Sequence, residues 1–172
     1  IIQNQITFLF QKTKDKRVIS FLKNKGFKVI ELDQKKNKIE DNIEVEIVKH
    51  DFYDSSISIK TPDIKILNLN DCPLRDIKEI KKFKNKYGEF DILLTQFSYA
   101  AWKGGKEGKI FRENAAKEKL VDITNQSKIL NCKKVIPFAS FVYFSNKLNF
   151  YMNDSMNTPE IVNNYLTKKS VD

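Results

Sequence analysis

The order of hydrophobic patterns along the chain is the feature that most restricts its fold. Between residues 31 and 70 apolar and polar residues alternate, as in IEVEI at residues 43–47, which predicts short, half-buried strands with no helix between them. From residue 74 onward, stretches with helical spacing alternate with short apolar runs. Strands followed by helix, strand, helix, strand and helix predict a layered α/β (α+β) fold, in which helices pack on a mixed sheet.

The individual elements follow from local signals. Helices are predicted over residues 14–25, 74–87 and 111–130, with a terminal helix that begins near Pro159. Gly26 and Gly88 are expected to end the first two helices, because glycine adopts the left-handed conformation common there. The runs FDILLTQF (90–97) and KKVIPFASFVYF (133–144) predict strands buried on both faces, the second stopped or bent by Pro137. No GxGxxG follows a strand, which argues against a dinucleotide-binding fold.

Length and composition predict one globular domain spanning residues 1–172. Hydrophobic residues make up 41% of the 172 residues, which is enough for a core and argues against disorder. The net charge of +9 comes from lysines scattered among acidic residues, and only three of the 31 basic residues are arginine. Arginine is preferred for bidentate phosphate contacts, so this distribution argues against nucleic acid as a partner.

The opening segment and the cysteines indicate a cytoplasmic protein without a membrane partner. The run IIQNQITFLF is too short to span a bilayer and lacks the basic region of a signal peptide. Cys72 and Cys132 lie far apart and form no CxxC pair, which predicts reduced thiols.

Polar residues follow three of the predicted buried strands, in ILNLNDC, ILLTQFSYAAW and VIPFASF. Ligands bind at this edge of the sheet in α/β proteins, so Asp71 is a candidate metal ligand. The alternative is that Asp71 belongs to a turn or caps the next helix. The candidate contacts for a small-molecule substrate are Gln96, Ser98, Tyr99, Trp102 and Ser140, and the alternative for them is a rigid, packed loop.

His50, the single histidine, is a second candidate metal ligand. It follows a predicted strand and precedes DFYDSS, which places it on a loop. A zinc site needs three or four ligands, so the alternative is a hydrogen-bonded surface histidine. Cys72 is interpreted as a small buried hydrophobic residue, with a soft metal ligand as the alternative.

Three segments resemble the metallo-β-lactamase fold superfamily: HDFYDSSISIKTPDIKILNLNDC, FDILLTQFSYAAW and VIPFASFVYFSNKLNFYMND. The most similar branch contains the ascorbate-phosphate lactonases and the hydrolase-like domain of the CMP-sialic acid hydroxylases. The resemblance implies a partial αββα sandwich. It also implies that Asp71 bridges two divalent metal ions (zinc, iron or manganese) and that His50 is the nearest match to a metal histidine.

The sequence departs from the family pattern in two places. The HxHxDH cluster is missing, and Ala139 or Ser140 stands where the last metal histidine is expected. The chain then corresponds to the C-terminal two thirds of such a domain, without its N-terminal HxHxDH part. Two explanations remain open: either the metal ligands lie in a segment upstream of Ile1, or the protein has lost its metal. The absence of an initiating Met favours the first.

The function that this resemblance implies is that of a metal-dependent hydrolase-like protein, inactive as the chain stands. It would be an enzyme only if the N-terminal part carried the remaining ligands. The expected substrate is a sugar or phosphoester, with surface-sugar metabolism as the setting. The alternative is a non-catalytic binding or scaffold module, and exposed sheet edges allow a homo-oligomer.

Overall fold

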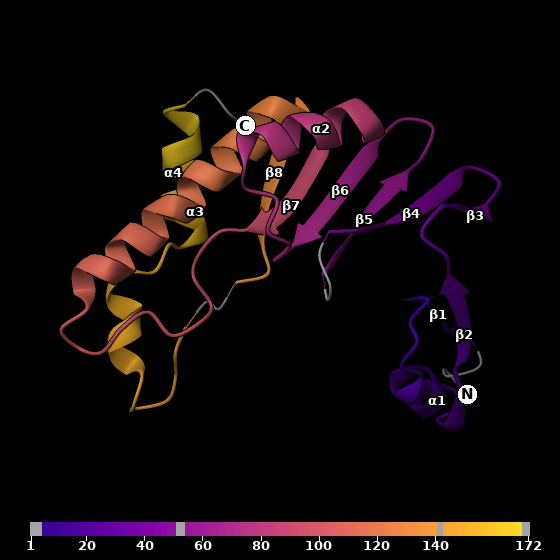
Figure 1. Cartoon of the computed structure of the whole chain (residues 1–172), viewed down its shortest axis with the longest axis horizontal. Helices are drawn as coiled ribbons and strands as arrows, with labels where there is room; N and C mark the ends of the chain where they lie inside the picture. The colour runs from indigo at the N-terminus through magenta and orange to yellow at the C-terminus, as the bar shows by residue number, and fades with distance from the viewer. Residues whose placement is uncertain (1–4, 51–53, 141–142, 170–172) are drawn as a thin grey trace.

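The computed structural model describes residues 5–50, 54–140 and 143–169, and its centre is a six-stranded mixed sheet (Figure 1). Strands β3 to β6 are antiparallel, while β6, β7 and β8 run parallel to one another. The order across the sheet is that of the chain: β3 (Lys36–Glu40), β4 (Ile43–Lys49), β5 (Ser55–Lys60), β6 (Lys65–Asn70), β7 (Ile92–Gln96) and β8 (Lys134–Phe138). The predicted mixed sheet is confirmed.

A small second sheet lies at the β3 end of the molecule (Figure 1). Its strands β1 (Thr7–Gln11) and β2 (Lys28–Leu32) are parallel and are joined by helix α1 (Arg17–Asn24). Leu32 packs against Val45 and Ile47 of β4, which connects this unit to the main sheet. Helix α1 is shorter than predicted, because the Asp15 carboxylate accepts a hydrogen bond from the Arg17 backbone N–H and so marks the start of the helix.

Helices α2 (Ile77–Tyr87), α3 (Lys109–Leu130) and α4 (Pro159–Thr167) form the layer above the sheet (Figure 1). A 3₁₀ helix, η2 (Phe150–Ser155), packs beside α3. Helix α2 begins later than predicted because the Asp76 carboxylate caps it, accepting hydrogen bonds from the backbone N–H groups of Lys78 and Glu79 at 2.8 and 3.1 Å. The largest core cluster joins sheet and helices through Leu67, Leu69, Ile80, Phe83, Leu93 and Leu130.

The opposite face of the sheet is open. Residues paired across strands share a face, and the pairs Ile66–Ile92 and Leu94–Ile136, with Phe138, place apolar side chains on the side away from Leu67 and Leu93. Within the described residues no helix covers this surface, and Ile136 and Phe138 are 45% and 42% exposed. The apolar run in β7 predicted cover on both faces, but this chain supplies it on one.

The prediction that β8 is a buried strand was wrong. The strand forms the edge of the sheet and is only half-buried. Pro137 pairs with Thr95, and the strand ends one residue later, at Phe138. Proline is tolerated there because an edge strand has one side on which no ladder hydrogen bond is required.

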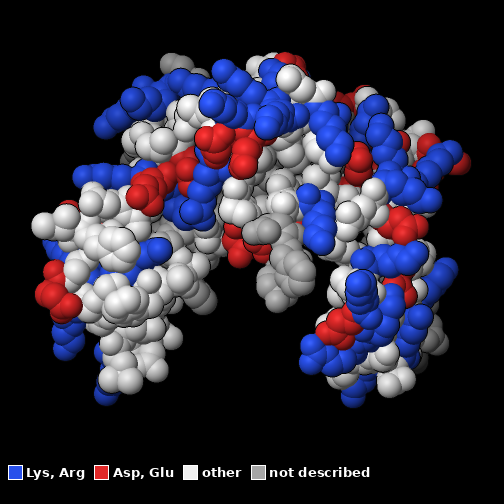
Figure 2. Space-filling model, viewed as in Figure 1, with Lys and Arg blue, Asp and Glu red and all other residues white. Residues whose placement is uncertain are grey.

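Lysine and arginine side chains are spread over the face seen in Figure 2, with Asp and Glu among them. None of the helices that the structure describes combines the length and the apolar content needed to cross a membrane.

Candidate functional site

The end of strand β6 is shaped by a tight polar turn. Asn70 has a φ of 54°, a left-handed conformation that asparagine tolerates better than most residues. Its side-chain Nδ2 donates to Asp71 Oδ1 at 2.8 Å, and the Cys72 N–H donates to the Leu69 carbonyl at 2.9 Å. The turn therefore leaves Asp71 exposed at the carboxyl end of β6, with one of its two oxygens already oriented.

Backbone strain gathers at this edge of the sheet. Asn70 follows directly from β6, and Ala139, which follows β8, has the same φ of 54°. Alanine has no side-chain hydrogen bond that compensates for this conformation, and such residues are concentrated at functional sites. Ala139 is also one of the two residues that stand where the resemblance places the last metal histidine.

A cavity of about 370 Å³ lies at the carboxyl ends of β6 and β7. Three of the predicted site residues line it: Asp71, Gln96 and Tyr99. They meet because the ends of neighbouring parallel strands fall at the same edge of a sheet. The rest of the lining comes from the segment before α2, the loop before α3 and α3 itself: Arg75, Ala100, Ala101, Lys103, Ala115, Glu118 and Lys119.

Ser98 and Ser140 lie next to this cavity without lining it. Ser140 Oγ accepts hydrogen bonds from the backbone N–H groups of Phe97 and Ser98, at 3.1 and 2.9 Å, and donates to the Ser98 carbonyl. Ser98 is fully buried, and its Oγ accepts from the Asn157 N–H at 3.0 Å. Both hydroxyls therefore tie β7, β8 and the segment before α4 together. Their predicted contact with a substrate stays a prediction.

Trp102 is also absent from the cavity lining, and its side chain is 69% exposed. The loop after β7, FSYAAWKGG, has residues on the cavity and residues bonded to the rest of the protein. Tyr99 and Lys103 line the cavity, whereas Gly104 accepts a hydrogen bond from the Tyr151 hydroxyl at 3.0 Å.

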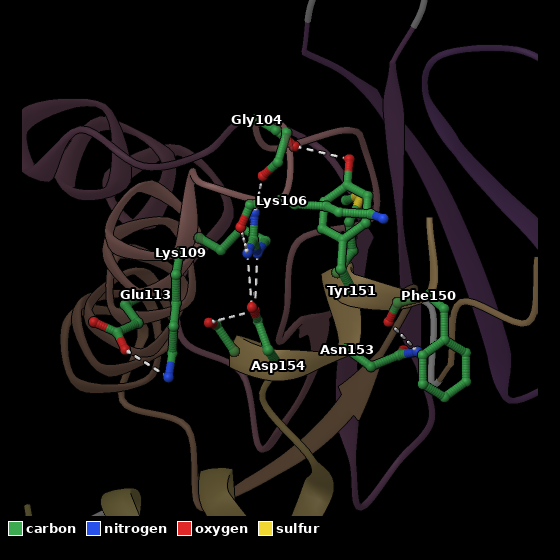
Figure 3. A network of polar contacts seen from close by, with 12 residues as sticks. Gly104, Lys106, Lys109, Glu113, Phe150, Tyr151, Asn153 and Asp154 are labelled. Atoms are coloured by element: carbon green, nitrogen blue, oxygen red, sulfur yellow. Dashed lines mark hydrogen bonds and ion pairs between the residues drawn. The ribbon is translucent and has the colours of Figure 1, made fainter. Parts of the chain in front are cut away.

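An ion pair between buried Arg112 and solvent-accessible Asp154 holds this loop in place. Arg112 of α3 is fully buried and donates to both carboxylate oxygens of Asp154 in η2, at 2.8 and 2.6 Å, and to the Gly105 carbonyl at 2.6 Å. The Arg112 hydrogen bonds lower the pKa of Asp154 to about 2. Figure 3 shows Asp154 and Tyr151 of η2 directed toward the glycine-rich loop. The cavity wall formed by the loop is thereby fixed to α3.

His50 lines a different cavity, between β4 and α2, of about 540 Å³. Its Nε2 lies 2.7 Å from Ser56 Oγ, and its ring stacks on Phe83 with centroids 5.5 Å apart. Burial lowers the pKa of His50 from 6.5, opposed by the charges of Asp54 and Glu79. The structure thus brings Asp71 together with Gln96 and Tyr99, but His50 lines neither that cavity nor any wall shared with them.

The described residues do not make a metal site by themselves. Among residues 5–50, 54–140 and 143–169, no three His, Cys, Asp or Glu side chains are grouped so that they could hold a metal ion. Asp71 alone is too few ligands. Cys72 and Cys132 are free, and burial raises the pKa of each thiol to about 12, so neither is a ready thiolate ligand.

Three cations in the cavity lining were missed by the sequence analysis. Arg75 Nε lies 3.5 Å from Asp122 Oδ2, and Lys103 Nζ lies 5.7 Å from the centroid of the Phe111 ring. Lys119 is half-buried, and burial followed by the charge of Arg75 lowers its pKa to about 8. Arg75 was detectable as one of three arginines in a lysine-rich chain, whereas nothing distinguished Lys103 or Lys119 from the other lysines.

Comparison with known proteins identifies the fold. No protein-family model matches the chain, and no curated protein matches its sequence. The solved structure of CmlA, a diiron β-hydroxylase from Streptomyces venezuelae, superposes with a TM-score of 0.54 over 93% of this chain, at 14% identity. A mutant of the CmlA β-hydroxylase gives the same TM-score and identity over 77% of the chain. The fold of this chain is therefore similar to that of part of CmlA.

The likeness is one of fold alone. The chain spans 37% and 31% of the length of the two CmlA structures, about a third of each. The six-stranded sheet with helices on one face agrees with a partial α/β sandwich.

Proposed function

We propose that this chain is part of a metal-dependent hydrolase-like protein of the metallo-β-lactamase fold, to which it contributes Asp71 and the cavity beside it. The observation that carries the proposal is the position of Asp71. Asp71 follows β6, which pairs in parallel with β7, and it lines the cavity at the ends of these strands. The fold is similar to that of a diiron enzyme. Asn70 orients one carboxylate oxygen, and the other makes no hydrogen bond to any residue that the structure describes.

In this proposal the remaining metal ligands come from outside the described residues, and the chain is inactive without them. A further sheet, contributed by residues outside this chain, covers the open face that carries Ile136 and Phe138. The length of the CmlA structures, about three times that of the matched region, supports such a missing part. The metal is zinc, iron or manganese, and the substrate is a small sugar or phosphoester that contacts Gln96 and Tyr99.

The test is the metal content of the complete gene product, compared between wild type, Asp71→Asn and Asp76→Asn. Asp76 is the matched control because it lies five residues away and caps α2, a role that asparagine also fills. We expect Asp71→Asn to lose bound metal while Asp76→Asn retains it. Unchanged metal content in Asp71→Asn removes this residue from the metal site and overturns the proposal.

A second candidate function is a non-catalytic binding module, and one specific observation favours it. No three potential ligands are grouped in the part of the chain that the structure describes, although that part includes the strand ends where they are expected. Under this alternative the complete gene product binds a small molecule at the Asp71 cavity without bound metal. Metal analysis therefore separates the two candidates directly.

A further inference from the structure

The cavity beside Asp71 collects three cations from distant parts of the sequence. Arg75 comes from the segment between β6 and α2, Lys103 from the loop after β7, and Lys119 from the middle of α3. The fold, rather than a local run of basic residues, therefore brings the three positive charges to one cavity.

Lys119 is the most informative of the three. Its side chain is half-buried, and it makes no hydrogen bond or salt bridge to any residue within 5–50, 54–140 or 143–169. Asp122, the acidic residue with the largest effect on the pKa of Lys119, is paired with Arg75 at 3.5 Å. A partly desolvated ammonium group without a partner is costly, and the cost is relieved when an anion enters beside it.

We propose that this cavity binds the anionic group of a small molecule, a phosphate or a carboxylate, through Arg75, Lys103 and Lys119. The proposal deepens the proposed function by naming the charge of the ligand, and it rests on the cavity assigned there but not on the metal. Arg75 supplies the planar fork that binds an oxyanion with two hydrogen bonds, while the two lysines act as point charges.

The acidic lining residues set the direction in which such a ligand lies. Asp71 and Glu118 are exposed members of the same lining, and like charges repel an anionic group. The anionic end of the ligand therefore lies at the cations, and its uncharged part lies toward Asp71 and Gln96. The lowered pKa of Lys119, about 8, agrees with a site that is incomplete without a negative partner.

The test measures binding of inorganic phosphate and of acetate to the chain by calorimetry at pH 7, in wild type, Lys119→Gln, Arg75→Gln and Lys117→Gln. Lys117 is the matched control because it is an exposed lysine on the same helix, two residues away. Loss of a charge-assisted hydrogen bond weakens binding by about tenfold or more, so we expect this loss in Lys119→Gln and Arg75→Gln only. Backbone amide spectra of each variant establish that it is folded.

Saturable binding of phosphate alone or of acetate alone supports the proposal and identifies the group. Equal affinity in all four proteins, or no saturable binding of either anion, overturns it. NMR of the lysine ammonium groups gives an independent readout, because a bound anion raises the pKa of Lys119. The Asp71→Asn variant separates this proposal from the metal site: we expect it to lose metal in the complete gene product while phosphate binding is retained or tightened.

Discussion

The guanidinium of Arg112 is fully buried and donates to both oxygens of the Asp154 carboxylate, at 2.8 and 2.6 Å. Asp154→Ala leaves the buried Arg112 without its counter-charge but with its bonds to the Gly105 and Lys106 carbonyls, so we expect it to lower the free energy of unfolding by about 1–3 kcal/mol. Urea denaturation measures this loss. Asp41→Ala, which removes the exposed partner of Lys38, is the control and should leave stability unchanged. If Asp154→Ala destabilises the protein no more than the control does, the Arg112–Asp154 ion pair does not stabilise the fold.

The same ion pair makes the free energy of unfolding depend on pH in the acidic range. The pKa of Asp154 is lowered from 3.8 to about 2, so the folded state favours the ionised carboxylate. Its contribution is present above pH 3.8 and is lost as the pH falls toward 2. We expect the stability of the wild type to fall across this range more steeply than that of Asp154→Asn. Parallel curves for the two proteins show that the carboxylate is not responsible.

His50 should make stability depend on pH in a higher range. Burial lowers its pKa below 6.5, so the unfolded chain binds the proton more readily than the folded one. The stabilisation is present above pH 6.5 and is lost as the pH falls from 6.5 through the lower pKa of the folded state. We expect a flatter profile between pH 5 and 7 in His50→Gln. As the chain has one histidine, its imidazole resonance reports the pKa directly, and a midpoint at or above 6.5 contradicts the expectation.

Asn157 is expected to be essential to the wall behind the cavity. Its buried side-chain Nδ2 donates to the carbonyls of Phe97 and Ala116 at 2.9 and 2.8 Å, and its backbone N–H donates to Ser98 Oγ. Asn157→Ala leaves buried carbonyls unsatisfied, which costs about 1–3 kcal/mol for each lost partner.

Because Ser98 shares this network, Ser98→Ala should also destabilise the protein, and the two losses should not add. A double-mutant cycle in urea measures the coupling. Strict additivity of the two losses means that the hydroxyl and the asparagine act independently. A Ser98→Ala variant of full stability would return Ser98 to the ligand-binding candidates.

The two thiols should be unreactive in the folded protein. Burial raises the pKa of both Cys72 and Cys132 to about 12, so almost no thiolate exists at pH 8. We expect alkylation by iodoacetamide to be slow in buffer and fast in urea, as followed by mass spectrometry. Rapid modification of Cys72 in buffer shows that the Asp71 turn opens and exposes it.

The sequence predicted what depends on local signals. Periodicity located the helices and the parallel strands, and it placed Asp71, Gln96 and Tyr99 at one edge because strand ends are marked by a change from apolar to polar residues. It failed where the outcome depends on distant contacts. Arg112 and Asp154 are 42 residues apart, and no sequence pattern predicts that they form an ion pair. Nothing in the sequence distinguishes Lys119 from the other lysines, because its position at the same cavity as Arg75 and Lys103 depends on the fold.

The same limit explains the error at β8. An apolar run in the sequence does not distinguish a central strand from an edge strand. In β8 the one local signal for an edge strand was Pro137, which has no backbone N–H to donate to a neighbouring strand. The separation of His50 from Asp71 was also invisible, since both follow predicted strands. Strands β4 and β6 run in the same direction, so both carboxyl ends lie at one edge of the sheet, but β5 lies between them and His50 stacks on Phe83 of α2.

The uncovered side of the central sheet determines how this polypeptide behaves in the test tube. Isoleucine, leucine and phenylalanine side chains on a flat pleated surface adhere to other apolar material, including further copies of the chain, as concentration and salt rise. Mild detergent or dilution should therefore alter the apparent size of the isolated chain without disturbing Asp71 or the cations above it. Ligand titrations should therefore be carried out under conditions in which the uncovered faces of separate molecules do not associate.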